Sequence, residues 1–185
     1  MWMKRTVTCG ELCNDHVGDE VVVNGWVHRR RDHGGLIFID VRDRYGVTQV
    51  VFNPKQSPES HSIAQELRAE YVIAICGLVA SRPAGTLNPE LGTGDVELQA
   101  KRIEILARSE TPPFYINEDV EVDETLRLKY RYLDLRRSRQ RDNIVLRHRL
   151  VKLIRDYMTE RNFLDIETPI LVKSTPEGSR DFIVP

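Results

Sequence analysis

The chain has no apolar run that approaches the roughly 20 residues needed to span a bilayer, so we expect no contact with a membrane. Its first residues, "MWMKRTVTCGEL", lack the apolar core of a signal peptide, which indicates a cytoplasmic protein. Cysteine is scarce: Cys9, Cys13 and Cys76 have no fourth partner at metal-ligand spacing. We therefore expect reduced thiols and no metal site.

Charge is abundant but balanced, with charged residues at 30%, hydrophobic residues at 41% and a net charge of -1. These proportions are typical of a soluble globular protein, and 185 residues allow one domain or a small domain with part of another. The cations between residues 127 and 155 are opposed only by Asp134 and Asp142, and they follow the acidic segment "NEDVEVDE". Either the acidic and basic blocks pair with each other on the surface, or the basic block binds RNA, and both alternatives stay open.

The first hundred residues alternate apolar runs with turn signals, which indicates short β-strands. Between the third and fourth runs, "SPESHSIAQELRAE" predicts a helix that Ser60 can cap. Three strands, a helix and two strands is the order of the oligonucleotide/oligosaccharide-binding (OB) barrel, with a generic small barrel or sandwich as the alternative. The predicted strands are "EVVVNGWVHR", "GLIFIDVRD", "GVTQVVFN", "YVIAICGLVASR" and "DVELQAKRIEIL".

The sequence therefore predicts a mainly β protein whose residues 1–108 form a five-stranded OB-fold barrel with an inserted helix. In "ARSETPPFYINED" the periodicity ends, and the adjacent prolines disfavour a helix. We interpret residues 109–140 as a linker with some helix in "ETLRLKYRYLDLRR", and residues 141–185 as the beginning of a second domain.

Residues 141 to 162 predict the strongest helix of the chain, and its apolar face is unusually broad. A helix with so broad a face is expected to be buried on two sides. Together with a strand at "FLDIETPILV" it cannot enclose a core, so its partners come from another copy or from the rest of a longer protein, and we favour the longer protein. One stripe comprises Ile144, Val151, Ile154 and Met158, and the other Leu146, Leu150, Leu153 and Tyr157.

The second predicted strand points an aromatic ring away from the core. Because side chains alternate along a strand, Ile37, Ile39 and Val41 face inward while Phe38 faces outward. If Gln49 of the third strand lies on the same open face, a ring that can stack on a base sits beside an amide that can both donate and accept. Phe38 alone could instead be half-buried beneath a loop.

Further groups suited to RNA lie near this face. Arg29, Arg30 and Arg31 in "GWVHRRRDHGG" could contact phosphates at the rim, although arginines in a loop are usually just solvated. Glu97, in the fifth strand, could accept two hydrogen bonds from the adjacent N–H donors of a guanine edge. In combination these residues favour single-stranded nucleic acid as the ligand.

Three segments resemble the bacterial aspartyl-tRNA synthetase family, in order and nearly without gaps: "GWVHRRRDHGGLIFIDVRDRYGVTQVVF", "RLKYRYLDLRR" and "FLDIETPILVKSTPEGSRDFIVP". The resemblance spans essentially the whole chain. It implies an N-terminal anticodon-binding OB domain, a hinge, and the truncated start of an α+β class II catalytic domain. "FLDIETPIL" matches the first class II motif, which implies a homodimer interface.

The resemblance assigns roles to individual residues. It implies that Phe38 stacks on the central uracil of the anticodon and that Gln49 bonds the edge of that base. It implies that Glu97 meets the first-position guanine and that Arg29 and Arg31 contact the anticodon loop.

The resemblance also implies an aspartate–tRNA ligase. Glu177, in "TPEGSRD", matches a residue that contacts bound L-aspartate, and a carboxylate suits the substrate's ammonium group. The ATP-binding motifs lie beyond Pro185, so we expect no catalytic residue and no bound cofactor in this chain, and no activity of the chain alone. ATP and Mg²⁺ are implied for the full-length enzyme.

Two positions bear on the choice of tRNA. His33 and Gly85 match positions associated with relaxed members of the family, which charge asparagine tRNA as well as aspartate tRNA. The two anticodons differ in their last base, and a neutral imidazole offers one donor and one acceptor to cytosine or uracil.

Two alternatives to this ligase remain. The first is a free-standing OB-fold module that binds single-stranded nucleic acid and dimerises through a helical tail. The second is a sister synthetase for asparagine or lysine. "STPEGSRDF" disfavours both, because a binding module needs no substrate-contacting turn and the sister families depart from this pattern.

Overall fold

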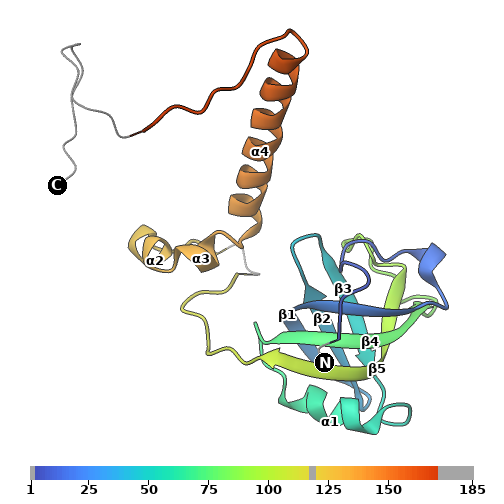
Figure 1. Ribbon diagram of the computed structural model, residues 1–185. Coiled ribbons are helices and arrows are strands. Elements are labelled where there is room, and N and C mark those ends of the chain that lie inside the picture. The colour runs from blue at the N-terminus through green and yellow to red at the C-terminus, as the bar shows by residue number, and fades with distance from the viewer. Residues whose placement is uncertain (1–2, 117–119, 171–185) are drawn as a thin grey trace, which may run out of the picture. The chain divides into compact units, whose positions relative to one another are not determined.

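The computed structural model describes residues 3–116 and 120–170, which fall into two compact units, Met1–Glu118 and Asp119–Pro185 (Figure 1). After a short 3-10 helix, η1 (Asn14–His16), the first unit contains strands and one helix. Its elements are β1 (Glu20–His33), β2 (Leu36–Arg42), β3 (Val47–Phe52), α1 (Pro58–Glu66), β4 (Val72–Ser81) and β5 (Val96–Ala107).

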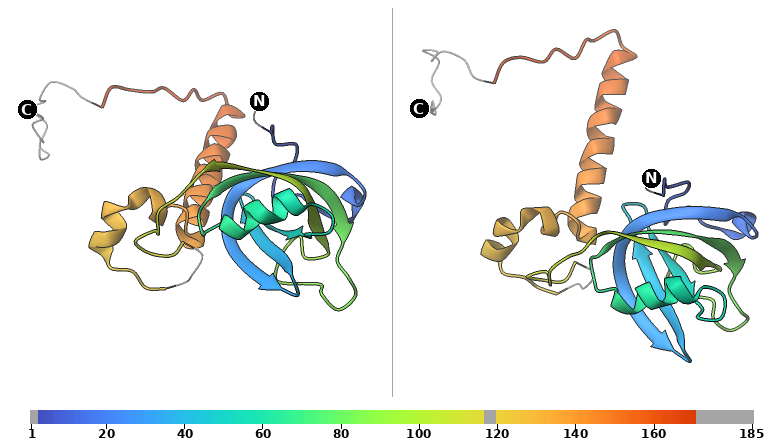
Figure 2. Two further views of the ribbon diagram at one scale, coloured as in Figure 1. Left: turned by 90° about the horizontal axis from the view of Figure 1, so that it is seen from below. Right: turned by 60° about the horizontal axis from the view of Figure 1, so that its bottom comes forward.

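The five strands close into a barrel in the order β1-β2-β3-β5-β4 (Figures 1 and 2). Every neighbouring pair is antiparallel except β3 and β5, which run parallel where the barrel closes. The predicted OB-fold barrel and its element order are thus confirmed.

The barrel encloses a single hydrophobic core that follows the two-residue period of its strands. Ile37, Ile39 and Val41 of β2 are at most 3% exposed, which confirms the inward face predicted for this strand. Other fully buried side chains include Val23, Val27, Val50, Phe52, Ile73, Ile75 and Leu98.

Helix α1 begins earlier than the sequence indicated, so the prediction that Ser60 caps it is wrong. Ser57 is the N-cap residue and Pro58 occupies the first turn, where a proline has a suitable φ and no N–H to leave unpaired. The Ser57 and Ser60 hydroxyls donate instead to the backbone carbonyls of Ala100 and Lys101, at 2.7 and 2.9 Å. These bonds attach α1 to β5.

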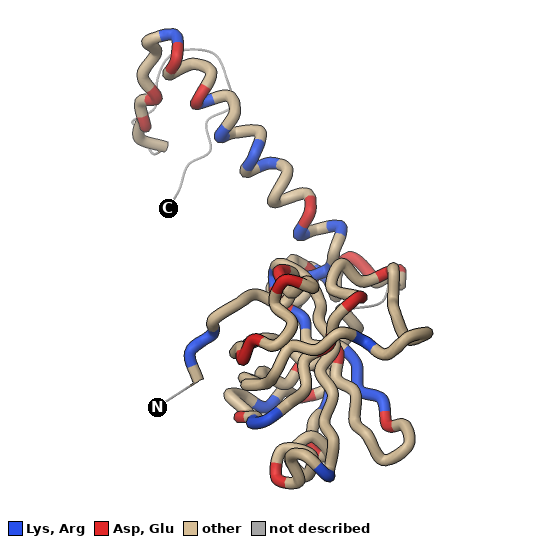
Figure 3. Tube along the Cα trace, turned by 90° about the vertical axis from the view of Figure 1, so that its right-hand side faces the viewer, with Lys and Arg blue, Asp and Glu red and all other residues tan. Residues whose placement is uncertain are grey.

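The second unit is helical in its described part, with α2 (Glu124–Lys129), α3 (Arg131–Asp134) and α4 (Ser138–Thr159). The strong predicted helix is present and starts three residues before the predicted 141. Basic positions recur along α4 (Figure 3). Within residues 163–170 the predicted strand is not formed, since a strand needs a hydrogen-bonded neighbour.

Both apolar stripes of α4 are exposed. Their side chains range from 37% exposed for Met158 to 66% for Leu146, and α4 buries no residue within the described chain. So much apolar surface on one helix marks an interaction site. No helix in the described ranges is long and apolar enough to cross a bilayer.

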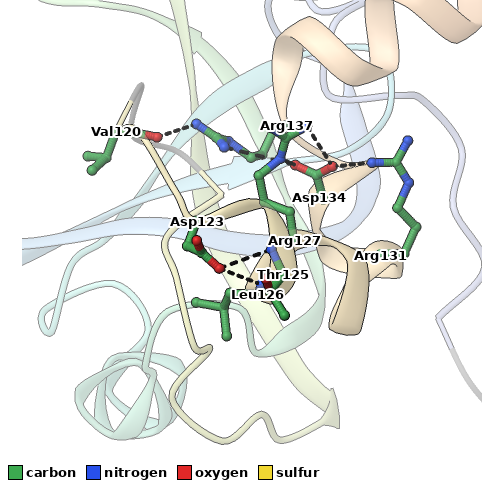
Figure 4. Close-up of polar contacts among 8 residues, drawn as sticks. All are labelled: Val120, Asp123, Thr125, Leu126, Arg127, Arg131, Asp134 and Arg137. Atoms are coloured by element: carbon green, nitrogen blue, oxygen red, sulfur yellow. Dashed lines mark hydrogen bonds and ion pairs between the residues drawn. The ribbon is translucent and has the colours of Figure 1, made fainter.

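A buried carboxylate organises the start of this unit (Figure 4). Asp134 is 0% exposed and pairs with Arg127, Arg131 and Arg137 at 3.1, 2.5 and 3.9 Å. Asp134 therefore neutralises part of the positive charge of the basic block. Asp123, from the acidic segment, caps α2 by accepting hydrogen bonds from two backbone N–H groups.

The closest approach of strands in the barrel requires glycine. A Cβ at Gly77 would lie 2.4 Å from the Gln99 carbonyl oxygen, whereas one at Gly92 would meet nothing within 4 Å. We predict that Gly77→Ala lowers the free energy of unfolding by about 1–3 kcal/mol through overpacking. Gly92→Ala is the matched control and should leave it nearly unchanged. Equal effects of the two substitutions in urea unfolding would contradict this interpretation.

Candidate nucleic-acid interface

The outer face of β2 and β3 carries the predicted base-binding side chains. In the register of the two strands, Phe38 lies opposite Val51 and Asp40 opposite Gln49. The Phe38 ring is half-buried on this outer face, away from the core formed by its neighbours. The structure therefore brings Phe38 and Gln49 to one surface.

A β-bulge in β1 adds arginines to this face. Val27 pairs with Val41 and Arg29 with Asp40, so His28 is the extra residue. Strict alternation would have turned Arg29 and Arg31 inward with Val27, but after the bulge they share the face of Asp40 and Phe38.

The middle arginine of the three is separated from the other two. Arg30 pairs in register with the core residue Ile39 and so projects from the opposite side of the hairpin. Its guanidinium forms an ion pair with Asp32 at 2.7 Å. Of the three arginines that the sequence placed at the rim, Arg29 and Arg31 thus lie on the face of Phe38, and Arg30 does not.

A chain of polar contacts crosses the face from β1 to β5. Arg31 donates to the Asp40 carboxylate at 2.7 Å and to Gln49 Oε1 at 3.2 Å. Gln49 Nε2 donates in turn to the Glu97 carboxylate at 3.1 Å. The three predicted residues Arg31, Gln49 and Glu97 and their neighbour Asp40 therefore form one continuous hydrogen-bonded row across four strands.

Glu97 is a buried carboxylate at the end of this row. Its side chain belongs to a residue that is 8% exposed. Burial raises the pKa of Glu97, and the Gln49 hydrogen bond and the Arg82 charge oppose that shift. A second carboxylate oxygen beyond the Gln49 contact leaves capacity to accept further hydrogen bonds.

Arg82, which follows β4, is a site residue that sequence reasoning missed. It is 7% exposed, donates to the Val96 and Thr86 carbonyls, and has one terminal nitrogen buried without a hydrogen-bond partner among the described residues. Burial lowers the pKa of Arg82, and the charges of Glu97 and Asp40 oppose that shift. Only the closed barrel reveals this proximity, because no local pattern in "VASRPAG" signals it.

The two predicted discrimination positions lie at the end of β1 and in the loop after β4. His33 ends β1 on the same face as Arg31, before the turn Gly34-Gly35, whose two positive φ angles indicate a type I′ hairpin. Gly85 has a φ of +86° in the loop that Arg82 holds through the Thr86 carbonyl.

Three further predictions concern the substrate residue Glu177, metal binding and the cysteines. Glu177 lies outside the described residues. Within the described ranges no group of three or more His, Cys, Asp or Glu side chains could hold a metal ion. Cys9, Cys13 and Cys76 are free, and Cys9 is fully buried.

This face can bind an unstacked base by ordinary physical means. An aromatic ring offers a stacking surface, and the adjacent Gln49 and Glu97 offer hydrogen-bonding groups at fixed positions. The carboxylates of Asp40 and Glu97 balance the charges of Arg31 and Arg82, so the centre suits an uncharged base edge better than a phosphate.

Two family models match the chain and divide it between them. The model described as "OB-fold nucleic acid binding domain" matches residues 21–106. The model described as "tRNA synthetases class II (D, K and N)" matches residues 123–185. The chain thus combines an OB-fold nucleic-acid-binding domain with a class II tRNA synthetase domain. The match of the C-terminal part disfavours the free-standing binding module considered above.

Curated relatives of this synthetase chain are similar over nearly its whole length. A protein of Syntrophomonas wolfei named "Aspartate--tRNA(Asp/Asn) ligase" is 57% identical over 99% of the chain, and one of Desulfotalea psychrophila with the same name is 55% identical. The chain spans about a third of the length of these relatives, 31% and 30% respectively.

Solved structures support the fold of the synthetase chain. Asparaginyl-tRNA synthetase from Pyrococcus horikoshii matches 90% of the chain and 38% of its own length, with a TM-score of 0.77 and 25% identity. The OBody AM2EP06, solved bound to hen egg-white lysozyme, matches 59% of the chain and 99% of its own length, with a TM-score of 0.51 and 28% identity. The OBody therefore corresponds to little more than half of this chain.

The buried Glu97 yields a prediction about stability. A carboxyl group whose pKa is raised by folding destabilises the folded state when it is ionised. This loss of free energy of unfolding is absent below the ordinary glutamate pKa and develops as pH rises from there through the pKa of the folded state. We predict that Glu97→Gln, which can still accept from Gln49, raises the free energy of unfolding at neutral pH. The gain should disappear in acid.

Glu90→Gln is the matched control, because Glu90 is an exposed residue in the loop after Arg82. It should not change the free energy of unfolding at either pH. A Glu97→Gln protein that is less stable than the wild type at neutral pH, measured by urea unfolding, would contradict the role given to burial.

Proposed function

We propose that this chain is the anticodon-recognising part of an aspartate–tRNA ligase, which attaches L-aspartate to tRNA-Asp and also to tRNA-Asn in an ATP-dependent reaction. The names of relatives similar over 99% of the chain support this activity. The observation that carries the proposal is the hydrogen-bonded row of Arg31, Gln49 and Glu97 beside the outward ring of Phe38.

The proposed binding mode uses each group of the row. Phe38 stacks on the central uracil, and Gln49 exchanges its contacts within the protein for the edge of that base. Glu97 accepts from the N–H donors of the first-position guanine, for which it must be ionised. Arg29 and Arg31 contact the anticodon loop, and Arg82 closes the row on the side of Glu97.

Such binding has a modest electrostatic penalty. Gln49 exchanges its hydrogen bonds within the row for hydrogen bonds to the base, so few hydrogen bonds are lost in total. Glu97 accepts through the oxygen that Gln49 does not use. The groups are held on strands of a closed barrel, so little conformational entropy is lost on binding.

The helical unit fits the remainder of the proposal. The two exposed stripes of α4 would be covered in a homodimer and by the rest of the catalytic domain. Glu177 would accept the ammonium group of L-aspartate, and ATP with Mg²⁺ would be bound by other parts of the enzyme. Cytoplasmic localisation follows from the role in tRNA charging.

Removal of the stacking ring tests the binding mode. We predict that Phe38→Ala weakens binding of an anticodon stem-loop RNA by about 1–3 kcal/mol, because one base loses its stacking surface. Titration at fixed salt measures the loss, and circular dichroism should show a folded barrel. Tyr45→Ala is the control, since Tyr45 is 60% exposed in the β2–β3 turn and outside the row. Unchanged affinity of Phe38→Ala would remove this residue from the site.

The relaxed choice of tRNA is tested in a full-length enzyme that contains this chain. We predict comparable charging of aspartate and asparagine tRNAs, and a changed ratio in His33→Leu, because leucine can hydrogen-bond to neither cytosine nor uracil at the last anticodon position. Initial rates with the two tRNAs measure the ratio. A strong preference for aspartate tRNA in both the wild type and His33→Leu would count against His33.

A further inference from the structure

We infer that His28 and the buried Arg42–Glu70 ion pair act as a positioning device, which holds the bulge in β1 and so aims Arg29 and Arg31 at bound RNA. The inference rests on the proposed anticodon-binding function and extends it to residues outside the row. These three residues, together with the backbone of Val27, are called the bulge clamp below.

The side chains of the bulge clamp form a connected set. Both carboxylate oxygens of Glu70 accept from one terminal nitrogen of Arg42, at 2.8 and 2.9 Å. The other terminal nitrogen of Arg42 donates to His28 Nδ1 at 2.8 Å. Because the guanidinium can only donate, Nδ1 must accept, which fixes the tautomer and orientation of the imidazole.

The backbone is clamped at the same place. The Glu70 N–H donates to the Val27 carbonyl at 2.8 Å, and the Val27 N–H donates to the Tyr71 carbonyl at 2.9 Å. Residues 70 and 71 therefore hold the residue directly before the bulge. The bulge is then fixed from two sides, through the His28 side chain and through the Val27 backbone.

Glu70 adopts a backbone conformation that argues for a specific role. Its φ is +66°, in the left-handed region that is unfavourable for a residue with a side chain. Glycine or asparagine would adopt this conformation more easily, but neither could form the ion pair with Arg42. A strained residue persists where its side chain is needed.

Stability alone does not explain a buried ion pair. Arg42 and Glu70 are each 8% exposed, and removing such charges from water offsets most of their attraction. Apolar residues of similar size could fill this place at comparable stability. Buried polar groups can instead specify one backbone geometry. Here that geometry is the one-residue register shift in β1, which turns Arg29 and Arg31 outward.

The test compares three substitutions in this chain by titration of an aspartate anticodon stem-loop at several salt concentrations. His28→Ala removes the acceptor for Arg42, and we expect it to weaken binding about tenfold. The slope of log affinity against log salt concentration should also become smaller, by about 0.7 for each phosphate that the arginines no longer neutralise. His28→Asn places an amide oxygen near the position of Nδ1 and should restore both the affinity and the salt slope. His148→Ala, on α4, is the control and should change neither.

A double-mutant cycle separates positioning from a direct contact. In an Arg29→Ala/Arg31→Ala background, His28→Ala should weaken binding no further, because the groups that it aims are gone. The same tenfold loss in that background would overturn the inference, as would wild-type affinity and salt slope in His28→Ala. If His28→Ala does not fold, Glu70→Gln is used in the same cycle and gives the same expected non-additivity.

The cycle also distinguishes this inference from the proposed function. Loss of affinity in Arg29→Ala/Arg31→Ala, with none in His28→Ala, would refute the bulge clamp alone. No loss in Arg29→Ala/Arg31→Ala would refute the proposed binding mode itself, and with it the inference.

Discussion

The parallel contact between β3 and β5 is the constraint on which the candidate interface depends. It pairs Val50 with Leu98 and so places the side chain of Gln49 next to that of Glu97. These two residues are 48 positions apart in the sequence, and their hydrogen bond exists only when the barrel is closed. The β2–β3 hairpin then adds Phe38, and the β1–β2 hairpin adds Arg31.

The charges of the interface are divided by role. At its centre, carboxylates and guanidinium groups lie close together and balance, which favours the neutral edges of bases. Arg29 is exposed at the rim, where a phosphate is more accessible. A surface that was basic throughout would bind any RNA strongly but would contribute little to the choice of sequence.

Much of this fold could be predicted from sequence because its signals are local. Strand alternation placed Ile39 in the core and Phe38 outside it, and the element order indicated an OB barrel. The bulge at His28 could not be predicted in this way, since the groups that bond to it and to Val27 come from Arg42, Glu70 and Tyr71, which lie in other parts of the chain. Arg82 was missed for the same reason, because its neighbours are set by barrel closure. The helix start at Ser57 was misjudged because a serine hydroxyl can bond to another strand as well as to a helix end.

The central claim is that the outer face of β2, β3 and β5 contacts the anticodon bases. It is tested most directly by following the backbone amide resonances of the labelled chain during titration with an anticodon stem-loop RNA. The account predicts that the largest changes occur at residues 29–33, 36–40, 49–51 and 82–86 and at Glu97, and that they depend on the identity of the anticodon bases. Changes confined to the helical unit, or changes that are the same for any loop sequence, would contradict it.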